Sequence, residues 1–403
     1  MRYKTDRARA AEFERELTES ILPFWMTHAV DELHGGLHGA VANDLRVLPD
    51  TPRSAVLCAR VLWTFSAAAS RFGGEAYRPM AERMLGVLSE TFWDPEHEGL
   101  YWSVDRHGVP VQDRKHHYAQ AFGIYGLSEY HRMSGDLRSL KLAQRLFALL
   151  EEHAFDPEYG GYTEGSTRDW RPLDDPRLSE RDVNAPKSMN TMLHLLEAYT
   201  NLSRVWQDGR LRARLVGLIR AFLTHIVDDA SGHLKLFFEP DWTSVVDMYS
   251  FGHDIEASWL LCEAAAVCRD RALLVETERA AIALASGVLR DGLDVDGSLF
   301  GEATPDGVVD RSKEWWPQAE AIVGFTHAYR LSDDERFVDA ASRCWDVVRT
   351  RFVDRTNGDW FKRLAPDGTP DPESRKTGPW EGPYHHSRAC LEMMERLAGS
   401  GED

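Results

Sequence analysis

The chain has 403 residues, and its 65 acidic side chains outnumber 47 basic ones, which gives a formal net charge of −18. Hydrophobic residues make up 43% and charged residues 28% of the chain, a composition that excludes an intrinsically disordered protein. Nucleic acids and anionic membrane surfaces select basic patches, so an acidic chain is a poor candidate for either. We therefore expect no nucleic-acid partner and no membrane partner.

The cysteines and the N-terminal segment bear on the compartment. The five cysteines are odd in number, widely spaced and without a C-x-x-C pair: Cys58, Cys262, Cys268, Cys344 and Cys390. This pattern argues against a disulfide framework and against a structural zinc site. Residues 1–20 are charged throughout, and no run of about 18 apolar residues occurs, so we expect neither a signal peptide nor a membrane-spanning helix. The default expectation is a reducing cytoplasm.

Apolar residues recur at helical spacing through most of the chain. In the segment that begins near residue 52, Val56, Ala59 and Leu62 form one apolar stripe. Thr51 is the expected N-cap of this helix, and Pro52 is its expected first residue. Patterns of this kind predict twelve helices, near residues 8–28, 52–72, 75–92, 117–134, 138–153, 187–204, 208–227, 252–269, 271–290, 314–330, 334–351 and 383–398.

A short phrase follows every second predicted helix. It consists of an Asp, a few polar residues, a Gly and then aromatic or apolar residues. Its aspartates are Asp31, Asp94, Asp156, Asp228, Asp291 and Asp354, at spacings of 63, 62, 72, 63 and 63 residues. The fourth and fifth copies keep the period but lose the Gly-aromatic detail. The phrases predict short turns or β-hairpins between six helical hairpins.

Six helical hairpins can form an open solenoid or a closed ring. Solenoids usually carry polar capping repeats, whereas the first and last repeats here resemble the others. We therefore predict an all-α fold, an (α/α)6 toroid with short β-hairpin or turn insertions, as a single domain over residues 1–403. The ten additional residues of the third interval fall in the polar segment 165–186, which we expect to be a long loop over the mouth of the central funnel.

In such a toroid the inner helices converge on the funnel, so residues far apart in sequence can meet there. Four groups stand out on the predicted inner helices: Asn190 with His194; His253 with Glu256; Trp315 and Trp316 with Glu320; and Trp380 with His385, His386 and Arg388. Arg60 and Tyr118 occupy comparable positions on two earlier helices. A single histidine or tryptophan is more often an ordinary packed residue. The prediction of a functional site therefore depends on these groups meeting in the funnel.

Histidine, arginine and tryptophan together suit one kind of chemistry. Histidine, with an unperturbed pKa of about 6.5, both accepts and donates protons near neutral pH. Two histidines on opposite faces of a carbon next to a carbonyl can invert that carbon, while Arg60 stabilises the enediolate formed in between. No cofactor is needed. No H-E-x-x-H motif, phosphate loop, nucleophile elbow or dinucleotide fingerprint occurs, and we expect no metal.

At these residues the sequence resembles the cellobiose 2-epimerases, within the N-acylglucosamine 2-epimerase superfamily of (α/α)6 barrels. The resemblance covers nearly the whole chain. Its most specific phrases are KSMNTMLHLLEAYT at 187–200, FGHDIEASW at 251–259, KEWWPQAE at 313–320, and GPW at 378–380 with PYH at 383–385. The phrases CARVLWTF at 58–65 and HYAQAF at 117–122 also fit.

The resemblance implies a role for each matching residue. His253 and His385 would be the acid/base pair at C2, and His194, supported by Glu256, would help to open and close the sugar ring. The implied substrate contacts are Arg60, Tyr118, Asp182, Asn190, Trp315, Trp316, Glu320 and Trp380. The implied reaction is reversible, cofactor-independent C2 epimerisation at the reducing end of a β-1,4-linked disaccharide such as cellobiose, through a cis-enediol, in a monomer or weak homo-oligomer.

The chain departs from the family pattern after its last tryptophan. Relatives usually continue with Lys-Cys-Pro-Tyr-His-Asn, whereas this chain has Glu381, Gly382 and His386. These departures do not affect the implied proton transfers, but they weaken the inference of a disaccharide preference from the resemblance. Free mannose therefore remains an alternative substrate, for a 2-epimerase or for a mannose/fructose isomerase. A glycoside hydrolase using two carboxylates among Asp182, Glu256 and Glu320 is a further alternative. So is a non-catalytic sugar-binding protein, which needs tryptophans but no histidine pair.

Overall fold

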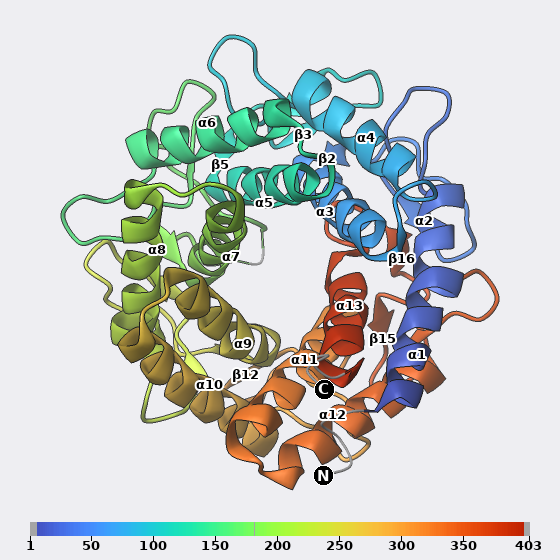
Figure 1. The fold of residues 1–403 in the computed structure, drawn as a ribbon, viewed down its shortest axis with the longest axis vertical. Coiled ribbons are helices and arrows are strands. Elements are labelled where there is room, and N and C mark those ends of the chain that lie inside the picture. Colours follow the sequence, from blue (N-terminus) through green and yellow to red (C-terminus); the bar gives the residue numbers. More distant parts are fainter. Residues whose placement is uncertain (1–5, 181, 399–403) are drawn as a thin grey trace.

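The computed structural model describes residues 6–180 and 182–398, and its helices form two concentric rings (Figure 1). The inner ring consists of α3 (Ala55–Phe72), α5 (His117–Ser134), α7 (Met189–Val205), α9 (Phe251–Cys268), α11 (Trp315–Ser332) and α13 (Tyr384–Ala398). The outer ring consists of α1 (Arg7–Arg15), α2 (Leu22–Thr27), α4 (Arg78–Gly86), α6 (Leu137–His153), α8 (Gly209–Ala221), α10 (Arg271–Asp291) and α12 (Glu335–Val347). Since α1 packs on α13, the N-terminal helix covers the C-terminal one and closes the predicted (α/α)6 toroid.

Four outer helices contain a π-helical turn. These turns are η1 (Glu16–Ile21), which joins α1 to α2, and η2 (Val87–Thr91), η3 (Phe222–Ile226) and η4 (Val348–Phe352), which end α4, α8 and α12. Within the described residues, none of the helices is long and apolar enough to cross a membrane.

Inner and outer helices bury different fractions of their surface. An inner helix has a neighbour on each side and an outer helix behind it, so nearly every residue of α3 and α9 is buried. By contrast, α12 buries one stripe that includes Phe337, Ala341 and Cys344 and exposes its opposite face. An apolar residue every three or four positions is enough to anchor an outer helix.

The recurring Asp phrase is a tight turn after each outer helix. Oδ1 of Asp94, for example, accepts hydrogen bonds from the backbone N–H groups of Glu96 (3.0 Å) and His97 (3.3 Å). The turn is completed by Gly99, whose φ of 70° favours glycine, and by an isolated bridge between Trp93 and Leu100. In the fifth copy the turn lies three residues later, between Leu293 and Leu299.

Short strands connect consecutive repeats at one end of the barrel. They are β1 (Val41–Ala42), β2 (Arg53–Ser54), β3 (Ser103–Val104), β4 (Pro110–Gln112), β5 (Lys115–His116), β6 (Gly165–Ser166), β7 (Lys187–Ser188), β8 (Val227–Asp228), β9 (His233–Leu234), β10 (Phe237–Phe238), β11 (Tyr249–Ser250), β12 (Glu302–Thr304), β13 (Gly307–Val308), β14 (Lys313–Glu314), β15 (Arg363–Leu364) and β16 (Arg375–Thr377). The strand before each of five inner helices pairs antiparallel with a strand of the next repeat, as in Lys115↔Ser166. The β1–β16 pair joins the last repeat to the first in the same way. The start of each of these helices is thereby fixed.

Buried ion pairs attach most of these strands to the preceding turn. Nζ of Lys115 lies 3.0 Å from Asp94, and both side chains are fully buried. The equivalent pairs are Arg53–Asp31 (2.7 Å), Lys187–Asp156 (2.7 Å), Lys313–Asp294 (2.8 Å) and Lys376–Asp354 (2.8 Å). The fourth repeat has Tyr249 at this position, and the ring of His233 stacks on it at 4.6 Å. These pairs place the first turns of the inner helices, which carry the site.

The twelve predicted helices are confirmed, with ends shifted by no more than three residues. The prediction that Thr51 caps α3 and Pro52 begins it is wrong. Arg53 and Ser54 form a strand, and Oγ of Ser54 caps the helix by accepting from the N–H of Leu57 at 3.4 Å. The helix therefore begins after the strand ends. The predicted span of residues 1–403 includes both chain ends, which lie outside the described residues.

Candidate functional site

A cavity of about 830 Å³ opens at the end of the barrel where the inner helices begin. Every inner helix contributes to its wall, through Arg60, Tyr118, Asn190, His194, His253, Trp315, Trp316 and His385. The loop 165–186 contributes Leu178, Ser179, Glu180 and Asp182, and the segment between β15 and α13 contributes Arg375, Trp380 and Glu381. Residues from positions 60 to 385 therefore converge on one space, as predicted from the repeats.

Helical spacing explains why these side chains share a face. Asn190 and His194 are four residues apart on α7, and His253 and Glu256 are three residues apart on α9. The same reasoning adds Glu197, three residues after His194, and Arg388, three residues after His385. His194, His253 and His385 line the wall, and the residues three positions after them, Glu197, Glu256 and Arg388, form a second layer deeper in the barrel.

Each of the three wall histidines has a hydrogen bond at Nδ1. The pairs are His385 with Oε1 of Glu320 (2.7 Å), His194 with Oε2 of Glu197 (3.0 Å) and His253 with Oγ of Ser250 (2.6 Å). A partner at one ring nitrogen fixes the ring orientation and leaves Nε2 for another partner. The aromatic ring of Trp316 contacts two of them, with centroid distances of 4.8 Å to His253 and 5.4 Å to His385.

Arg388 is the centre of the deeper layer. It is 2% exposed and donates to Glu256 (2.5 Å), to Glu320 (2.8 Å) and also to Glu197. One guanidinium thus compensates three buried carboxylates, two of which also bind wall histidines. The side chain lies against the rings of Tyr384 and Trp259, with centroid distances of 4.4 and 4.7 Å.

Burial and the neighbouring positive charges keep His253 and His385 neutral. Burial, together with His194 and Arg60, lowers the pKa of His253 to about 3. Burial, together with Arg60 and Arg388, lowers the pKa of His385 well below its usual value. Desolvation disfavours the charged form of an imidazole, and a nearby cation adds to the effect. Both imidazoles are therefore uncharged at neutral pH and keep a free lone pair on the ring.

The pKa of Glu256 is shifted in the opposite direction, upward. Its Oε2 is buried without a hydrogen-bond partner among the described residues, while Oε1 pairs with Arg388. Burial, and then the charge of Glu320, raises the pKa of Glu256 to about 7. This carboxyl group can thus hold a proton at neutral pH.

Arg60 is fixed with its guanidinium in the cavity wall. It donates to the hydroxyl of Tyr118 (2.8 Å) and to the carbonyl of Trp380 (3.4 Å), and its guanidinium carbon lies 4.4 Å from the ring centroid of Phe122. Oδ1 of Asn190, also in the wall, is buried without a protein partner among the described residues. A fixed cation and an unpaired amide oxygen suit the oxygens of a sugar.

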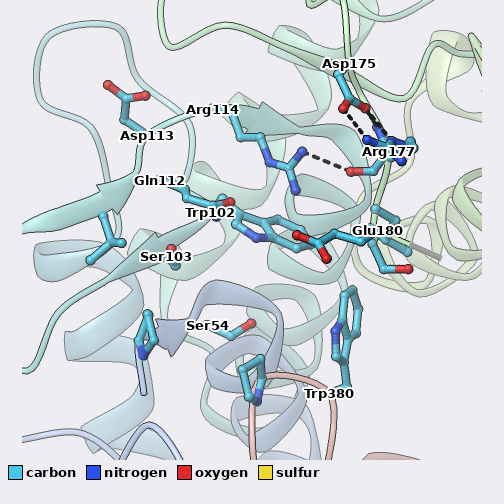
Figure 2. A pocket seen from close by; sticks show the side chains of 15 residues that line it. Ser54, Trp102, Ser103, Gln112, Asp113, Arg114, Asp175, Arg177, Glu180 and Trp380 are labelled. Carbon is cyan, nitrogen blue, oxygen red and sulfur yellow. Dashed lines mark hydrogen bonds and ion pairs between the residues drawn. The ribbon is translucent and has the colours of Figure 1, made fainter. Parts of the chain in front are cut away.

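A second cavity, of about 700 Å³, adjoins the first beside Trp380 (Figure 2). The two cavities share Leu178, Ser179, Glu180 and Trp380 in their linings. Trp102 lies 5.8 Å from Trp380 between ring centroids, and the guanidinium of Arg114 lies over Trp102. The loop 165–186 thus reaches the funnel mouth, as expected.

Some candidate residues lie away from the cavity. Glu256 and Glu320 are fully buried behind its wall, where they contact Arg388. His386, next to His385 in sequence, binds Asp359 at 2.7 Å in the barrel wall. Adjacent helical residues do not share a face, so the His386 departure does not reach the cavity, whereas Glu381 does. Other tryptophans hold repeats together, as Trp170 does by donating to the carbonyl of His97 (2.8 Å).

Among the residues that the structure describes, two groups of side chains have the donor types of a metal site. They are His194, His253 and Glu256, and Glu256, Glu320 and His385; in each group the ligand atoms lie within 4.8 Å of one another. Imidazole and carboxylate donors suit zinc. Arg388 binds both glutamates directly, however, and the charge of Arg60 acts on both His253 and His385. These cations would oppose a metal ion, so the donors fit an acid–base cluster better.

Comparison with known proteins places this arrangement in a family. The model of the N-acylglucosamine 2-epimerase (GlcNAc 2-epimerase) family matches residues 35–389. A cellobiose 2-epimerase of Bacteroides fragilis is 42% identical over 387 residues, which cover 95% of this chain and 98% of the relative. The solved structure of cellobiose 2-epimerase from Bacillus thermoamylovorans superposes with a TM-score of 0.92 at 41% identity and covers 97% of this chain and 100% of its own. A D-mannose isomerase of Thermobifida fusca is 27% identical over 349 residues, 80% of each chain.

The chain therefore belongs to the N-acylglucosamine 2-epimerase family. Within that family it is an isomerase of the sugar 2-epimerase kind, similar to the cellobiose 2-epimerases.

Proposed function

We propose that the chain epimerises the reducing-end sugar of β-1,4-linked disaccharides such as cellobiose at C2, without a cofactor. The observation that carries this proposal is the pair of neutral histidines, His253 and His385, that contact the same tryptophan in a cavity of suitable size. Similarity to proteins named cellobiose 2-epimerase supports the choice of substrate.

Ring opening comes first. His194 accepts the proton of the anomeric hydroxyl while the C1–O5 bond breaks, and the proton is returned to O5, which yields the open-chain aldehyde. Glu256 lies in the same group of side chains, and its unpaired Oε2 can hold a proton close to His194 during this exchange. Ring closure at the end of the reaction is the reverse.

Inversion at C2 then needs one base on each face of the carbon. One of His253 and His385 removes the C2 proton, and the other takes up a proton from solvent as the negative enediolate forms and delivers it to the opposite face. The enediolate formed in between faces the fixed guanidinium of Arg60. Glu320, which we expected as a substrate contact, instead acts through His385 in this scheme, because its carboxylate binds Nδ1 and fixes the orientation of the ring.

The remaining predicted residues bind the sugar. Arg60 and Asn190 hold the oxygens of the open chain, and the aromatic rings supply stacking surface. The further contacts are Tyr118, Asp182, Trp315, Trp316 and Trp380. Trp380 lines both cavities, so a second sugar linked to the reacting one has room beside it, which favours a disaccharide over free mannose.

The rival activities fit the geometry less well. A glycoside hydrolase needs two carboxylates facing the scissile bond. Of its three candidates only Asp182 lines the cavity, whereas Glu256 and Glu320 lie behind the wall and bind Arg388. An isomerase would share the enediolate and return the proton to C1 in place of C2. Free mannose as substrate would leave the cavity beside Trp380 unused.

Proton NMR in deuterated water tests the proposal, with cellobiose, lactose, β-mannobiose and D-mannose in separate tubes. We expect deuterium at C2 of the reducing sugar and a mixture of glucose and mannose configurations, fastest with a disaccharide. Accumulation of fructose from mannose would establish an isomerase instead, cleavage of a disaccharide would establish a hydrolase, and no change in any tube would overturn the proposal.

A further inference from the structure

Glu197 lies behind His194 on α7 and is not part of the cavity wall. Its side chain is 3% exposed, and both of its oxygens are engaged. Oε2 lies 3.0 Å from Nδ1 of His194. Oε1 accepts hydrogen bonds from the hydroxyl of Tyr384 and from the guanidinium of Arg388. Both of these donors come from α13, 187 and 191 residues later in the sequence.

These contacts determine whether the carboxyl group of Glu197 is ionised. Burial opposes its ionisation, but Arg388, His194 and Tyr384 together outweigh that effect and lower the pKa of Glu197. An ionised carboxylate can accept hydrogen bonds but cannot donate them. The proton between Glu197 and His194 therefore resides on Nδ1, and the lone pair of the imidazole is on Nε2.

We propose that Glu197 is a positioning residue that holds His194 in the Nδ1–H tautomer and so makes Nε2 the nitrogen that exchanges protons with the sugar during ring opening. The proposal rests on the ring-opening role proposed for His194. In this step Nε2 takes the proton of the O1 hydroxyl as the C1–O5 bond breaks and then gives the proton to O5, so the histidine is unchanged at the end. A proton on Nε2 would block the first transfer.

The variant Glu197→Gln tests this because its amide has a defined orientation. Arg388 can only donate hydrogen bonds, so the amide oxygen must face Arg388 and Tyr384. The amide NH2 then faces Nδ1 of His194 and donates to it. The variant should therefore shift the imidazole proton from Nδ1 to Nε2 while the heavy atoms stay in place.

Nitrogen-15 NMR of histidine-labelled protein reads the tautomer without any substrate, with the His194 signals identified by their loss in His194→Gln. We expect Nδ1–H in the wild type and Nε2–H in Glu197→Gln. The second readout is ring opening itself, followed by polarimetry as the mutarotation of fresh α-cellobiose above the spontaneous rate. Since a wrong histidine tautomer in a Ser-His-Asp triad lowers kcat by about 10⁴, we expect enzyme-dependent mutarotation to fall by roughly 10² to 10⁴-fold.

Glu151→Gln is the matched control. Glu151 is also buried and also binds tyrosine hydroxyls, those of Tyr162 (2.5 Å) and Tyr199 (3.3 Å), together with Arg214 (2.5 Å). It belongs to outer helix α6, away from the cavity. Glu151→Gln should leave both the tautomer and mutarotation unchanged, even where it lowers stability.

The outcomes separate this proposal from the proposed function. An unchanged tautomer in Glu197→Gln overturns the proposal, and so does a changed tautomer with unchanged mutarotation. A wild type that turns over no sugar overturns the proposed function, while the tautomer measurement still decides whether Glu197 positions His194.

Discussion

Replacement of Arg388 by methionine should strongly destabilise the protein. Arg388 is the shared cation of Glu197, Glu256 and Glu320, and methionine retains much of its aliphatic volume against Tyr384. Removal of one partner from a buried ion pair costs about 3–5 kcal/mol because a charge is left uncompensated. Glu256 already has its pKa raised to about 7, so it can take up a proton and keep the cost of Arg388→Met within about that range.

The pH dependence of this cost follows from the same carboxylates. A carboxyl group whose pKa is raised in the folded state binds more protons there than in the unfolded state, so its contribution to stability falls as the pH rises through that range. Arg388→Met should raise the pKa values of Glu256 and Glu320 further and raise that of Glu197 from its lowered value. The difference in free energy of unfolding between the variant and the wild type should therefore be larger at pH 8 than at pH 6.

Urea unfolding followed by tryptophan fluorescence measures this difference. Arg204→Met is the control, because Arg204 is 33% exposed and forms a single ion pair, with Glu263 at 3.2 Å. An exposed pair of this kind is worth about 0–1 kcal/mol. Equal costs for the two variants, or a cost for Arg388→Met that does not change with pH, would refute the reasoning.

Two further predictions concern the fold. His233 lies between Asp254 (2.8 Å) and Asp291 (3.0 Å); burial alone would lower its pKa, but the two carboxylates outweigh burial and raise it. The contribution of this protonated histidine to stability is thus fully present below the unfolded pKa of about 6.5 and is lost as the pH rises through the higher folded value. The loss of unfolding free energy in His233→Asn, measured by urea unfolding, should therefore be largest near pH 6 and smaller at pH 8.5. A loss that does not change with pH would contradict this. A Cβ at Gly126 would lie 2.6 Å from the carbonyl oxygen of Ala59 where α5 packs on α3, so Gly126→Ala should cost about 1–3 kcal/mol. Gly217→Ala, with nothing within 4 Å of the added atom, should gain about 0.5–1 kcal/mol. Stabilisation by Gly126→Ala would show that the contact between α5 and α3 is not tight, and destabilisation by Gly217→Ala would contradict the expected gain.

The fold could be predicted from the sequence because its signals are local. Each repeat carries its own apolar stripe and its own turn phrase, and the regular spacing of Asp31 to Asp354 indicates how the repeats follow one another. Thr51 misled the prediction of a helix start because capping preference is local, whereas the actual start depends on the pairing of Arg53 with Val104, some 50 residues away.

The cavity wall could also be predicted in large part, since its histidines and tryptophans are conspicuous residue types. The layer behind it could be predicted only in part: Glu256, Glu320 and Arg388 stand out in the sequence, but Glu197 and the contacts that join these residues do not. Glu197, Tyr384 and Arg388 meet through contacts between helices nearly 190 residues apart, and such pairs leave no periodic signal in a single sequence. A helical projection would have placed Glu197 on the face of His194, and the same projection would have removed His386 from the site.

Stereospecific exchange at C2 tests the two-base account most directly. His253→Asn and His385→Asn should each abolish epimerisation, because neither remaining base can serve both faces of the carbon. The measurement follows cellobiose and its mannose-configured epimer separately by proton NMR in deuterated water. Each variant should still exchange the C2 proton of one of the two epimers for deuterium, and the two variants should act on opposite epimers. Continued interconversion of the epimers in either variant, or exchange of both epimers by the same variant, would contradict the account.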